Sequence, residues 1–388
     1  MKIVLFANTD WYLFNFRQGL AFALKARGHE VVLLSPPGEY GQKLVDSGFR
    51  WEPLEMDRRS LGLLAELMVL IRLFQWLRRE GPDLVHAFTI KCAIYSSICC
   101  LFAGVKMRVN AIAGMGYVFT SSDIRARLLR PIVSGLLRVA MTGRCARLIV
   151  QNSSDAAFAI DSGICDRDSL RIIFGSGVDT NEFAPSGRTV GSERRLRVLL
   201  AARLLRDKGV FEFAEAARLL KATHSEIEFI LAGRPDIGNP AAIPIETIES
   251  WVAADTVEWL GHVEDMSALL KCIDVFVLPS YREGLPKGLI EAGACGCGLI
   301  TTDAPGCNEV VRDGLDGLIV PVGNAQKLAQ AIVRFERDRG LLGRLGEHAR
   351  ESVIQRFDLR IVVEQTLSVY DELMYGNEPL HATLYQEA

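Results

Sequence analysis

The feature that most restricts this 388-residue chain is an alternation of short apolar strands with amphipathic helices, which runs through the sequence twice. The first series starts with a strand at 2–7, and the helix that follows it ends before Gly28. The pattern restarts at 196–202, after a polar stretch without periodicity. Apolar strands that alternate with helices are typical of a parallel sheet covered on both faces. The sequence therefore predicts an α/β fold of two doubly wound, Rossmann-like domains.

The expected strands of the first series are 2–7, 31–35, 83–87, 108–112, 147–151 and 172–174, and those of the second are 196–202, 228–232, 257–260, 275–278, 298–302 and 318–320. The expected helices are 13–27, 41–47, 61–79, 90–102, 125–144, 211–222, 266–271, 289–294, 326–335, 341–355 and 359–374.

These elements suggest a domain division. Residues 1–180 form an N-terminal domain, 181–195 a linker and 196–356 a C-terminal domain, and the helix within 357–388 is expected to pack back on the N-terminal domain. Two such domains in tandem are expected to face each other across a cleft at the carboxyl edges of their sheets, where ligands bind in such folds.

Charge is divided unevenly along a chain of ordinary globular composition. The net charge is -3, yet residues 1–180 hold 22 basic and 16 acidic side chains, a net of +6. A basic N-terminal half indicates an anionic partner. Nucleic acid is the less favoured partner, because the sequence has no recognised nucleic-acid-binding module.

Cysteine usage and hydropathy indicate a cytoplasmic protein. The nine cysteines lack the spacing of a zinc site and are expected to be reduced, buried thiols. The first residues read as a strand rather than a signal peptide. The apolar segments 61–77 and 92–105 fall short of the ~20 residues that a membrane-spanning helix needs.

The stretch from Glu283 to Glu291 has the clearest chemical content. Glu283 lies in the loop after the strand 275–278, and Glu291 lies eight residues on, in the helix that this loop opens. The backbone N–H groups of a first helical turn have no partners within the helix and suit anions and hydroxyls. A carboxylate on each side of such a site suits a ligand with phosphates in its middle and hydroxyls at both ends, as in a nucleotide-sugar.

A basic loop follows the first strand of the C-terminal series. It places Arg203 at the strand end and Lys208 at the start of the next helix. A guanidinium and an ammonium suit the two phosphates of a diphosphate. A solvated basic loop is the alternative.

Several polar residues of the N-terminal half lie at expected strand ends. His86, near the end of the strand 83–87, can donate to a sugar hydroxyl or take a proton, or it can be a packed, hydrogen-bonded histidine. Asp10 is a candidate acid or base, and Thr9, Asp10 and Asn15 are equally candidates for capping a helix. The segment around them lacks the Gly-x-Gly-x-x-Gly fingerprint of dinucleotide binding.

The segment from Arg125 to Arg147 combines basic and apolar residues. No acidic residue occurs from 124 to 154, and leucine, isoleucine and valine are interleaved with six arginines. Such a helix can lie in an anionic membrane interface, although its apolar stripe also suits packing on a sheet. We expect a peripheral protein on the inner face of the cell membrane.

The sequence resembles the retaining GT-B glycosyltransferases of family four, and most closely the bacterial branch that builds capsule, O-antigen and glycoprotein glycan precursors on a polyprenyl diphosphate. The motifs that carry the resemblance are Glu283 to Glu291, Ala-Arg203-Leu-Leu-Arg-Asp-Lys208-Gly, Phe174-Gly-Ser-Gly-Val-Asp179, the segment 8–17, Val85-His-Ala-Phe-Thr-Ile-Lys91 and the segment 110–119. The loop 113–117 has no histidine where many relatives carry one, so that role is not transferred.

The resemblance implies roles for individual residues. Arg203 and Lys208 would hold the donor diphosphate and stabilise it as a leaving group, and Glu283 would hold hydroxyls of the transferred sugar. The donor would also contact Val263, Gly284, Leu285, Pro286, Lys287 and, through its ribose, Glu291. Independently of these roles, we expect the N-terminal domain to bind the acceptor through Asp10, Asn15, His86 and Lys91.

The expected function is transfer of a sugar, possibly an N-acetylhexosamine such as GalNAc, from a UDP-sugar to a polyprenyl-diphosphate-linked saccharide, with retention. No cofactor or metal is expected, since two fixed cations can neutralise the departing diphosphate. A sugar-nucleotide epimerase of the same two-domain form is the alternative, and a non-catalytic nucleotide-sugar sensor is a weaker one.

Overall fold

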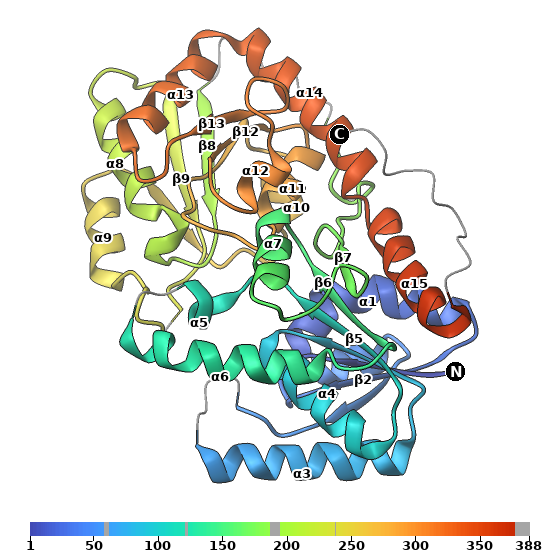
Figure 1. The fold of residues 1–388 in the computed structure, drawn as a ribbon. Coiled ribbons are helices and arrows are strands. Elements are labelled where there is room, and N and C mark those ends of the chain that lie inside the picture. Colours follow the sequence, from blue (N-terminus) through green and yellow to red (C-terminus); the bar gives the residue numbers. More distant parts are fainter. Residues whose placement is uncertain (58–61, 121–122, 187–194, 237, 377–388) are drawn as a thin grey trace. The chain divides into compact units, whose positions relative to one another are not determined.

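The computed structural model describes residues 1–57, 62–120, 123–186, 195–236 and 238–376. The chain divides into two compact units (Figure 1). The first comprises Met1–Ser176 and the residues from Val362 onward, and the second comprises Gly177–Ile361. Each unit is built on one parallel sheet with helices on both faces, which confirms the predicted α/β fold class.

The first unit holds a seven-stranded sheet of order β3-β2-β1-β4-β5-β6-β7. Its strands are β1 (Lys2–Phe6), β2 (Glu30–Ser35), β3 (Arg50–Pro53), β4 (Leu84–Phe88), β5 (Met107–Ile112), β6 (Ala146–Val150) and β7 (Leu170–Ile172). Its helices are α1 (Asp10–Ala26), α2 (Gly41–Asp46), α3 (Leu63–Glu80), α4 (Ile90–Ala103), α5 (Gly116–Thr120), α6 (Ile124–Ala140), α7 (Ser153–Asp161) and most of α15 (Leu359–Tyr375).

The side chains of this sheet alternate between two cores. In β1, Ile3 and Leu5 belong to the cluster beneath α1 and α15, whereas Val4 and Phe6 belong to the cluster beneath α3 and α4. Successive side chains of a strand point to opposite faces, so every strand position is assigned to one helical layer or the other. Burial on both faces accounts for the continuous apolar runs in the sequence.

The second unit holds a six-stranded sheet of order β10-β9-β8-β11-β12-β13. Its strands are β8 (Leu196–Ala201), β9 (Ile227–Ala232), β10 (Glu258–Gly261), β11 (Val275–Leu278), β12 (Gly298–Thr302) and β13 (Leu318–Val320). Its helices are α8 (Val210–Lys221), α9 (Ile245–Ala253), α10 (Met266–Leu270), α11 (Lys287–Ala294), α12 (Cys307–Val310), α13 (Ala325–Arg337) and α14 (Arg339–Arg356), and the 3₁₀ turn η1 covers Arg206–Lys208.

Some elements were not predicted. The strand β3 is a short edge strand with two charged residues among its four, so it lacks the apolar run by which the other strands were found. The helices α7 and α9 are nine residues each and give a weak periodic signal. The helix expected over 125–144 ends at Ala140 and continues through Pro131.

The last helix returns to the first unit. The unit boundaries fall after Ser176 and before Val362, rather than at 180 and 357, and Val362, Leu367 and Tyr370 of α15 are buried in the core beneath α1. Part of the proposed linker, 187–194, and the terminal residues 377–388 lie outside the described residues.

Candidate active site

The order of the second sheet brings two distant loops together. β8 and β11 are hydrogen-bonded neighbours, with Val198 opposite Val275 and Leu199 opposite Phe276. The chain leaves β8 toward β9 on one side and reaches β11 later on the other, so the two strands flank the point where the strand order reverses. Ligands of open α/β sheets bind outside the carboxyl ends of strands at such a point.

A glycine allows the two loops to touch. Gly209 follows the turn η1 with φ of 71°, and a Cβ built on it would lie 2.1 Å from the carbonyl oxygen of Pro279. The backbone N–H of Tyr281 donates to the carbonyl of Asp207 at 2.9 Å. Because only glycine accepts this conformation at this contact distance, the loop that carries Lys208 is fixed directly against the loop that carries Glu283.

Lys208 and Glu283 form the central pair of the site. The Lys208 Nζ lies 2.5 Å from Oε1 and 2.6 Å from Oε2 of Glu283, and the side chains are 15% and 11% exposed. The hydroxyl of the fully buried Ser280 donates to Glu283 Oε1 at 2.7 Å. Ser280 was not predicted as a site residue. A serine three residues before a glutamate at a strand end was the signal available for it.

The backbone of Glu283 is also fixed. Its N–H donates to the carbonyl of Pro305 at 2.9 Å, in the loop after β12. Gly306 has φ of 81°, and a Cβ on it would lie 2.6 Å from the carbonyl oxygen of Glu283. Three neighbouring strand ends, those of β8, β11 and β12, therefore position one carboxylate.

The helix α11 begins directly after this loop, at Lys287, two residues before the start that the sequence predicted. Pro286 precedes it without a capping side chain, and Gly288 packs 3.0 Å from the ring of Phe276 as measured from a built Cβ. Within the helix, Lys287 Nζ lies 3.2 Å from Glu291 Oε1. Burial raises the pKa of the Glu291 carboxyl, and the nearby ammonium of Lys287 opposes this shift. The Glu291 side chain is 12% exposed, so its carboxyl is largely buried.

Arg203 lies apart from the Lys208–Glu283 pair. Its side chain is 62% exposed, and its Nη1 donates to Asp236 Oδ2 at 2.9 Å in the loop after β9. Val263 follows β10 by two residues and is half-buried. The structure therefore brings Lys208 and Glu283 together, and Lys287 and Glu291 together, but it does not join Arg203 to either pair. The Asp236 partner was not predicted.

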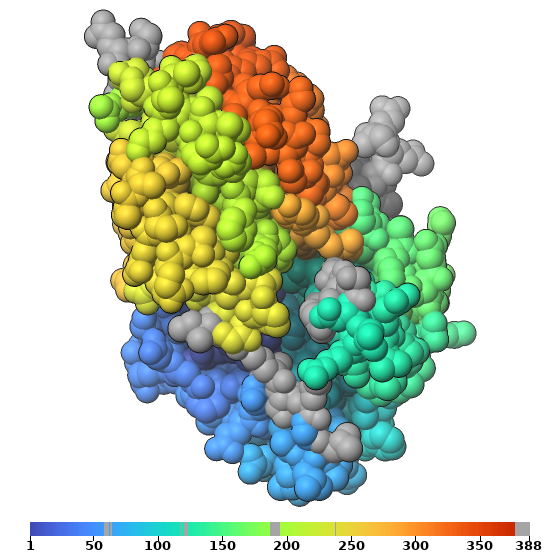
Figure 2. Space-filling view, turned by 90° about the vertical axis from the view of Figure 1, so that its left-hand side faces the viewer, coloured from blue at the N-terminus to red at the C-terminus, as the bar shows by residue number. Residues whose placement is uncertain are grey.

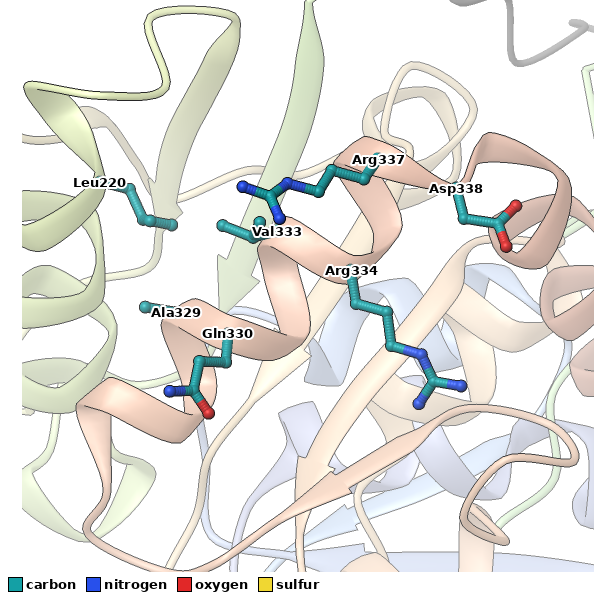
Figure 3. A pocket seen from close by; sticks show the side chains of 7 residues that line it. All are labelled: Leu220, Ala329, Gln330, Val333, Arg334, Arg337 and Asp338. Atoms are coloured by element: carbon teal, nitrogen blue, oxygen red, sulfur yellow. The ribbon is translucent and has the colours of Figure 1, made fainter.

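A surface groove in this unit is unrelated to these loops. It has a volume of about 550 Å³ and is lined by Leu220 of α8 and by α13 with Asp338 after it. Figure 3 shows Leu220 facing Ala329 and Val333 across the groove. None of the predicted site residues lines it.

Asp10, in the first unit, is held by backbone donors. Its Oδ2 accepts from the N–H of Tyr40 at 2.7 Å and of Gly41 at 2.9 Å, and its Oδ1 accepts from the N–H of Trp11 at 2.8 Å. Both oxygens are occupied and the residue is 5% exposed. The prediction of an acid, base or acceptor contact at Asp10 does not fit this geometry, because the carboxylate fastens the 38–41 loop to α1. Thr9 caps the helix.

His86 is a second correction. β4 extends to Phe88, so His86 lies inside the strand, on the face beneath α1 and α15, and is 1% exposed. Its Nδ1 lies 2.5 Å from the hydroxyl of Tyr370. Burial lowers its pKa well below the usual range, and the nearby cation of Arg17 adds to this. The packed-histidine alternative describes His86 in this structure, and an acceptor contact does not.

The remaining acceptor candidates are differently exposed. Asn15 is exposed on α1, with its amide donating to the Trp11 carbonyl at 2.9 Å. Lys91 is mostly buried, and its Nζ lies 2.8 Å from Glu66 Oε1 on α3 and 2.7 Å from the Asp57 carbonyl. The charge of Lys91 is thus balanced within the first unit, whereas Asn15 faces solvent.

The helix α6 exposes an apolar stripe. Its segment lies at the molecular surface in Figure 2, in the teal part of the first unit. Ala126, Leu137 and Ala140 face inward. The exposed apolar side chains recur at helical spacing and are Ile124 (75%), Leu128 (68%), Ile132 (59%), Leu136 (36%) and Val139 (44%). Within the described residues, every helix is too short or too polar to cross a membrane.

The arginines of this region are not equivalent. Arg125, Arg127, Arg138 and Arg144 are exposed. Arg138 donates to the carbonyls of Ser162 and Gly163, and Arg147 pairs with Glu372 at 3.5 Å. Four of the six arginines are thus exposed, while the charge of Arg147 is balanced by Glu372.

The assembled groups of the second unit can do defined chemistry. An ammonium at a helix start suits the phosphates of a leaving group, and the carboxylate beside it can accept hydrogen bonds from hydroxyls. A second carboxyl, that of Glu291, lies within α11, and the sequence predicted a ribose contact for it.

Comparisons with known families and proteins identify the class of this chain. Residues 188–352 match the family described as Glycosyl transferases group 1, and residues 2–152 match the family described as Glycosyl transferase 4-like. The chain therefore belongs to the glycosyltransferases of the GT-B fold. This decides against the epimerase and sensor alternatives.

Individual relatives cover nearly the whole chain. One is the N,N'-diacetylbacillosaminyl-diphospho-undecaprenol alpha-1,3-N-acetylgalactosaminyltransferase of Campylobacter jejuni, 28% identical over 96% of this chain and 99% of the relative. Another is the UDP-Gal:alpha-D-GlcNAc-diphosphoundecaprenol alpha-1,3-galactosyltransferase of Escherichia coli, 26% identical over 81% and 82%. The structure of Anabaena HepE in complex with UDP-glucose is 20% identical over 96% of this chain and 100% of that chain, with a TM-score of 0.76.

Proposed function

We propose that this glycosyltransferase moves a sugar from a UDP-sugar to a polyprenyl-diphosphate-linked saccharide in the assembly of a bacterial surface polysaccharide or glycoprotein glycan. An N-acetylhexosamine such as GalNAc is the proposed sugar, because the Campylobacter relative matches nearly the whole length of both chains. The observation that carries the proposal is the meeting of Lys208 and Glu283 at the carboxyl ends of β8 and β11.

The second unit binds the donor in this proposal. Lys208, with Arg203, holds the diphosphate, and Glu283 accepts hydrogen bonds from the sugar. The loop from Gly284 to Lys287 and Val263 complete the donor contacts, and Glu291 takes the ribose hydroxyls. Preorganised charge at a leaving group is usually the largest contribution to catalysis, and here it replaces a metal ion.

The reaction is proposed to proceed with retention of the anomeric configuration. The departing phosphate oxygen takes the proton from the acceptor hydroxyl on the same face of the sugar. This assigns no side chain as general base, in keeping with an Asp10 saturated by backbone donors and a His86 enclosed in the core. The anomeric configuration of the product, read by NMR coupling constants, tests this point.

The first unit binds the lipid-linked acceptor and the membrane surface. Asn15 is the acceptor candidate that faces solvent, and Lys91 is retained as a second. The exposed stripe of α6, with Arg125 and Arg127 beside it, suits an interface of apolar chains beneath anionic headgroups. α3, which like α6 packs against α4, adds the exposed Leu64, Leu67, Met68 and Ile71.

Incubation of the protein with a panel of UDP-sugars and polyprenyl-diphosphate-linked saccharides tests the function. A new lipid-linked saccharide, detected by chromatography and mass spectrometry, is expected with one donor, and GalNAc is the first to try. Absence of product with every UDP-sugar on the panel, in the presence of lipid-linked acceptors that differ in their terminal sugar, would refute the proposed donor class.

A further inference from the structure

The ammonium of Lys208, which is proposed to bind phosphate, is paired with a carboxylate of the protein itself. Both oxygens of Glu283 lie within 2.6 Å of Lys208 Nζ, and Ser280 donates to one of them at 2.7 Å. The pair is mostly buried and its two backbones are fixed by Gly209 and Gly306. The contact is therefore built into the loops and is not a chance meeting of flexible surface side chains.

We infer that the Lys208–Glu283 ion pair is a latch that couples phosphate binding to sugar binding, an inference that rests on the proposed donor site. A diphosphate that takes Lys208 must break the pair and leave the Glu283 carboxylate without its cation. A sugar on that diphosphate repairs the loss, because its hydroxyls donate to the released carboxylate. A nucleoside diphosphate has no sugar hydroxyls to donate to Glu283, so it must break the ion pair without this compensation.

The physical basis is the cost of an uncompensated, desolvated charge. Breaking an ion pair by removing one partner is unfavourable mainly because the other charge remains buried and unpaired. The serine that is hydrogen-bonded to Glu283 satisfies only one of its acceptor positions. The latch thus favours the intact nucleotide-sugar over its nucleoside diphosphate, which is also the product that must leave after transfer.

The test is the affinity for UDP, the probe that carries the diphosphate without a sugar, measured by calorimetry. Glu283→Gln keeps the shape of the side chain and removes its charge, so Lys208 is no longer held. UDP is expected to bind at least about fivefold more tightly to this variant, because the diphosphate no longer has to break a mostly buried ion pair. Uridine, which has no phosphate, is expected to bind as it does to the wild-type protein. The variant is expected to lose turnover at the same time.

Two further variants separate the latch from simpler explanations. In a Lys208→Met background, Glu283→Gln is expected to leave the affinity for UDP unchanged, because no pair remains to be broken. A gain that persisted in that background would arise from repulsion between Glu283 and the phosphates, and would overturn the latch. Glu336→Gln is the matched control. It removes a carboxylate of α13 that is paired with His224, and it is expected to leave UDP binding unchanged.

The outcomes distinguish the latch from the proposed function. If Glu283→Gln binds UDP as weakly as the wild-type protein or more weakly, the latch is wrong, and transfer from a UDP-sugar by the wild-type protein still supports the function. If the wild-type protein neither binds UDP nor transfers from any UDP-sugar, the donor assignment and the latch are both wrong.

Discussion

Gly209 and Pro279 approach so closely that a single added methyl group would place carbon 2.1 Å from a carbonyl oxygen. The two residues belong to loops that follow different strands, and their contact is what sets Lys208 beside Glu283. The catalytic proposal therefore depends on a backbone contact that carries no chemistry of its own.

Replacement of Gly209 by alanine is expected to cost about 3 kcal/mol of unfolding free energy, since the added Cβ overlaps backbone and φ is positive. Chemical denaturation monitored by circular dichroism measures the change. Gly314→Ala is the matched control, because Gly314 also has positive φ but has open space around it, and it should cost about 1 kcal/mol. Equal losses in both variants would show that the contact with Pro279 is unimportant.

Removal of either proposed phosphate ligand should slow transfer. Lys208→Ala and Arg203→Ala are each expected to lower kcat by about 100-fold or more, the scale of losing one preorganised donor to a developing negative charge. Steady-state rates with the preferred donor provide the measurement. Arg334→Ala, in the groove between α8 and α13, controls for loss of a surface cation. A rate near that of the wild-type protein in either test variant would remove that residue from the mechanism.

Chelation of divalent metal should leave turnover unchanged, because the proposed neutralisation of the diphosphate uses the fixed cations of Lys208 and Arg203. The comparison is the rate before and after dialysis against EDTA, with the same buffer lacking EDTA as control. A loss of activity that Mg²⁺ or Mn²⁺ restores would show that a metal shares this task.

Charges placed on the apolar stripe of α6 should weaken membrane binding. The double variant Leu128→Glu, Ile132→Glu is expected to reduce co-sedimentation with phosphatidylglycerol vesicles at least tenfold, because it removes buried apolar area and adds repulsion. Leu219→Glu, Val252→Glu alters two exposed apolar residues of the second unit and serves as control. Wild-type binding is also expected to fall with added salt. Undiminished binding of the α6 variant would place the membrane contact elsewhere.

His86 makes the stability of the first unit depend on pH. Its pKa is lowered in the fold, so the unfolded chain takes up the proton first. The free energy of unfolding is therefore independent of His86 protonation above about pH 6.5. Below that value it falls by ~1.4 kcal/mol per pH unit, because only the unfolded chain takes up the proton. Denaturation midpoints between pH 7.5 and 5.5 should show this slope in the wild-type protein.

The same measurement on two variants identifies the group responsible. The slope below pH 6.5 should become much shallower in His86→Gln, where His29, whose pKa burial also lowers, still contributes. It should be unchanged in His348→Gln, which alters an exposed histidine. An undiminished slope in His86→Gln would mean that His86 is not the buried neutral group that the structure shows.

Much of the fold could be read from periodicity, and the failures have physical causes. The strands β11, β12 and β13 were predicted at their observed limits because they are apolar runs with clear boundaries. The edge strand β3 was missed because it does not need an apolar run on both faces. The strand that holds His86 was predicted to end at 87, one residue before its observed end at Phe88. His86 therefore appeared to lie near the sheet edge, although it is buried inside the strand.

The sequence by itself determined the two α/β units, the donor loops and the acidic and basic residue types within them, because these follow from local pattern and composition. Only the tertiary structure decided which of these residues meet. The strand order joins β8 to β11 and so pairs Lys208 with Glu283, while the return of α15 encloses His86 and the 38–41 loop saturates Asp10. Partners that are distant in the chain are set by strand order and packing, which no local pattern encodes.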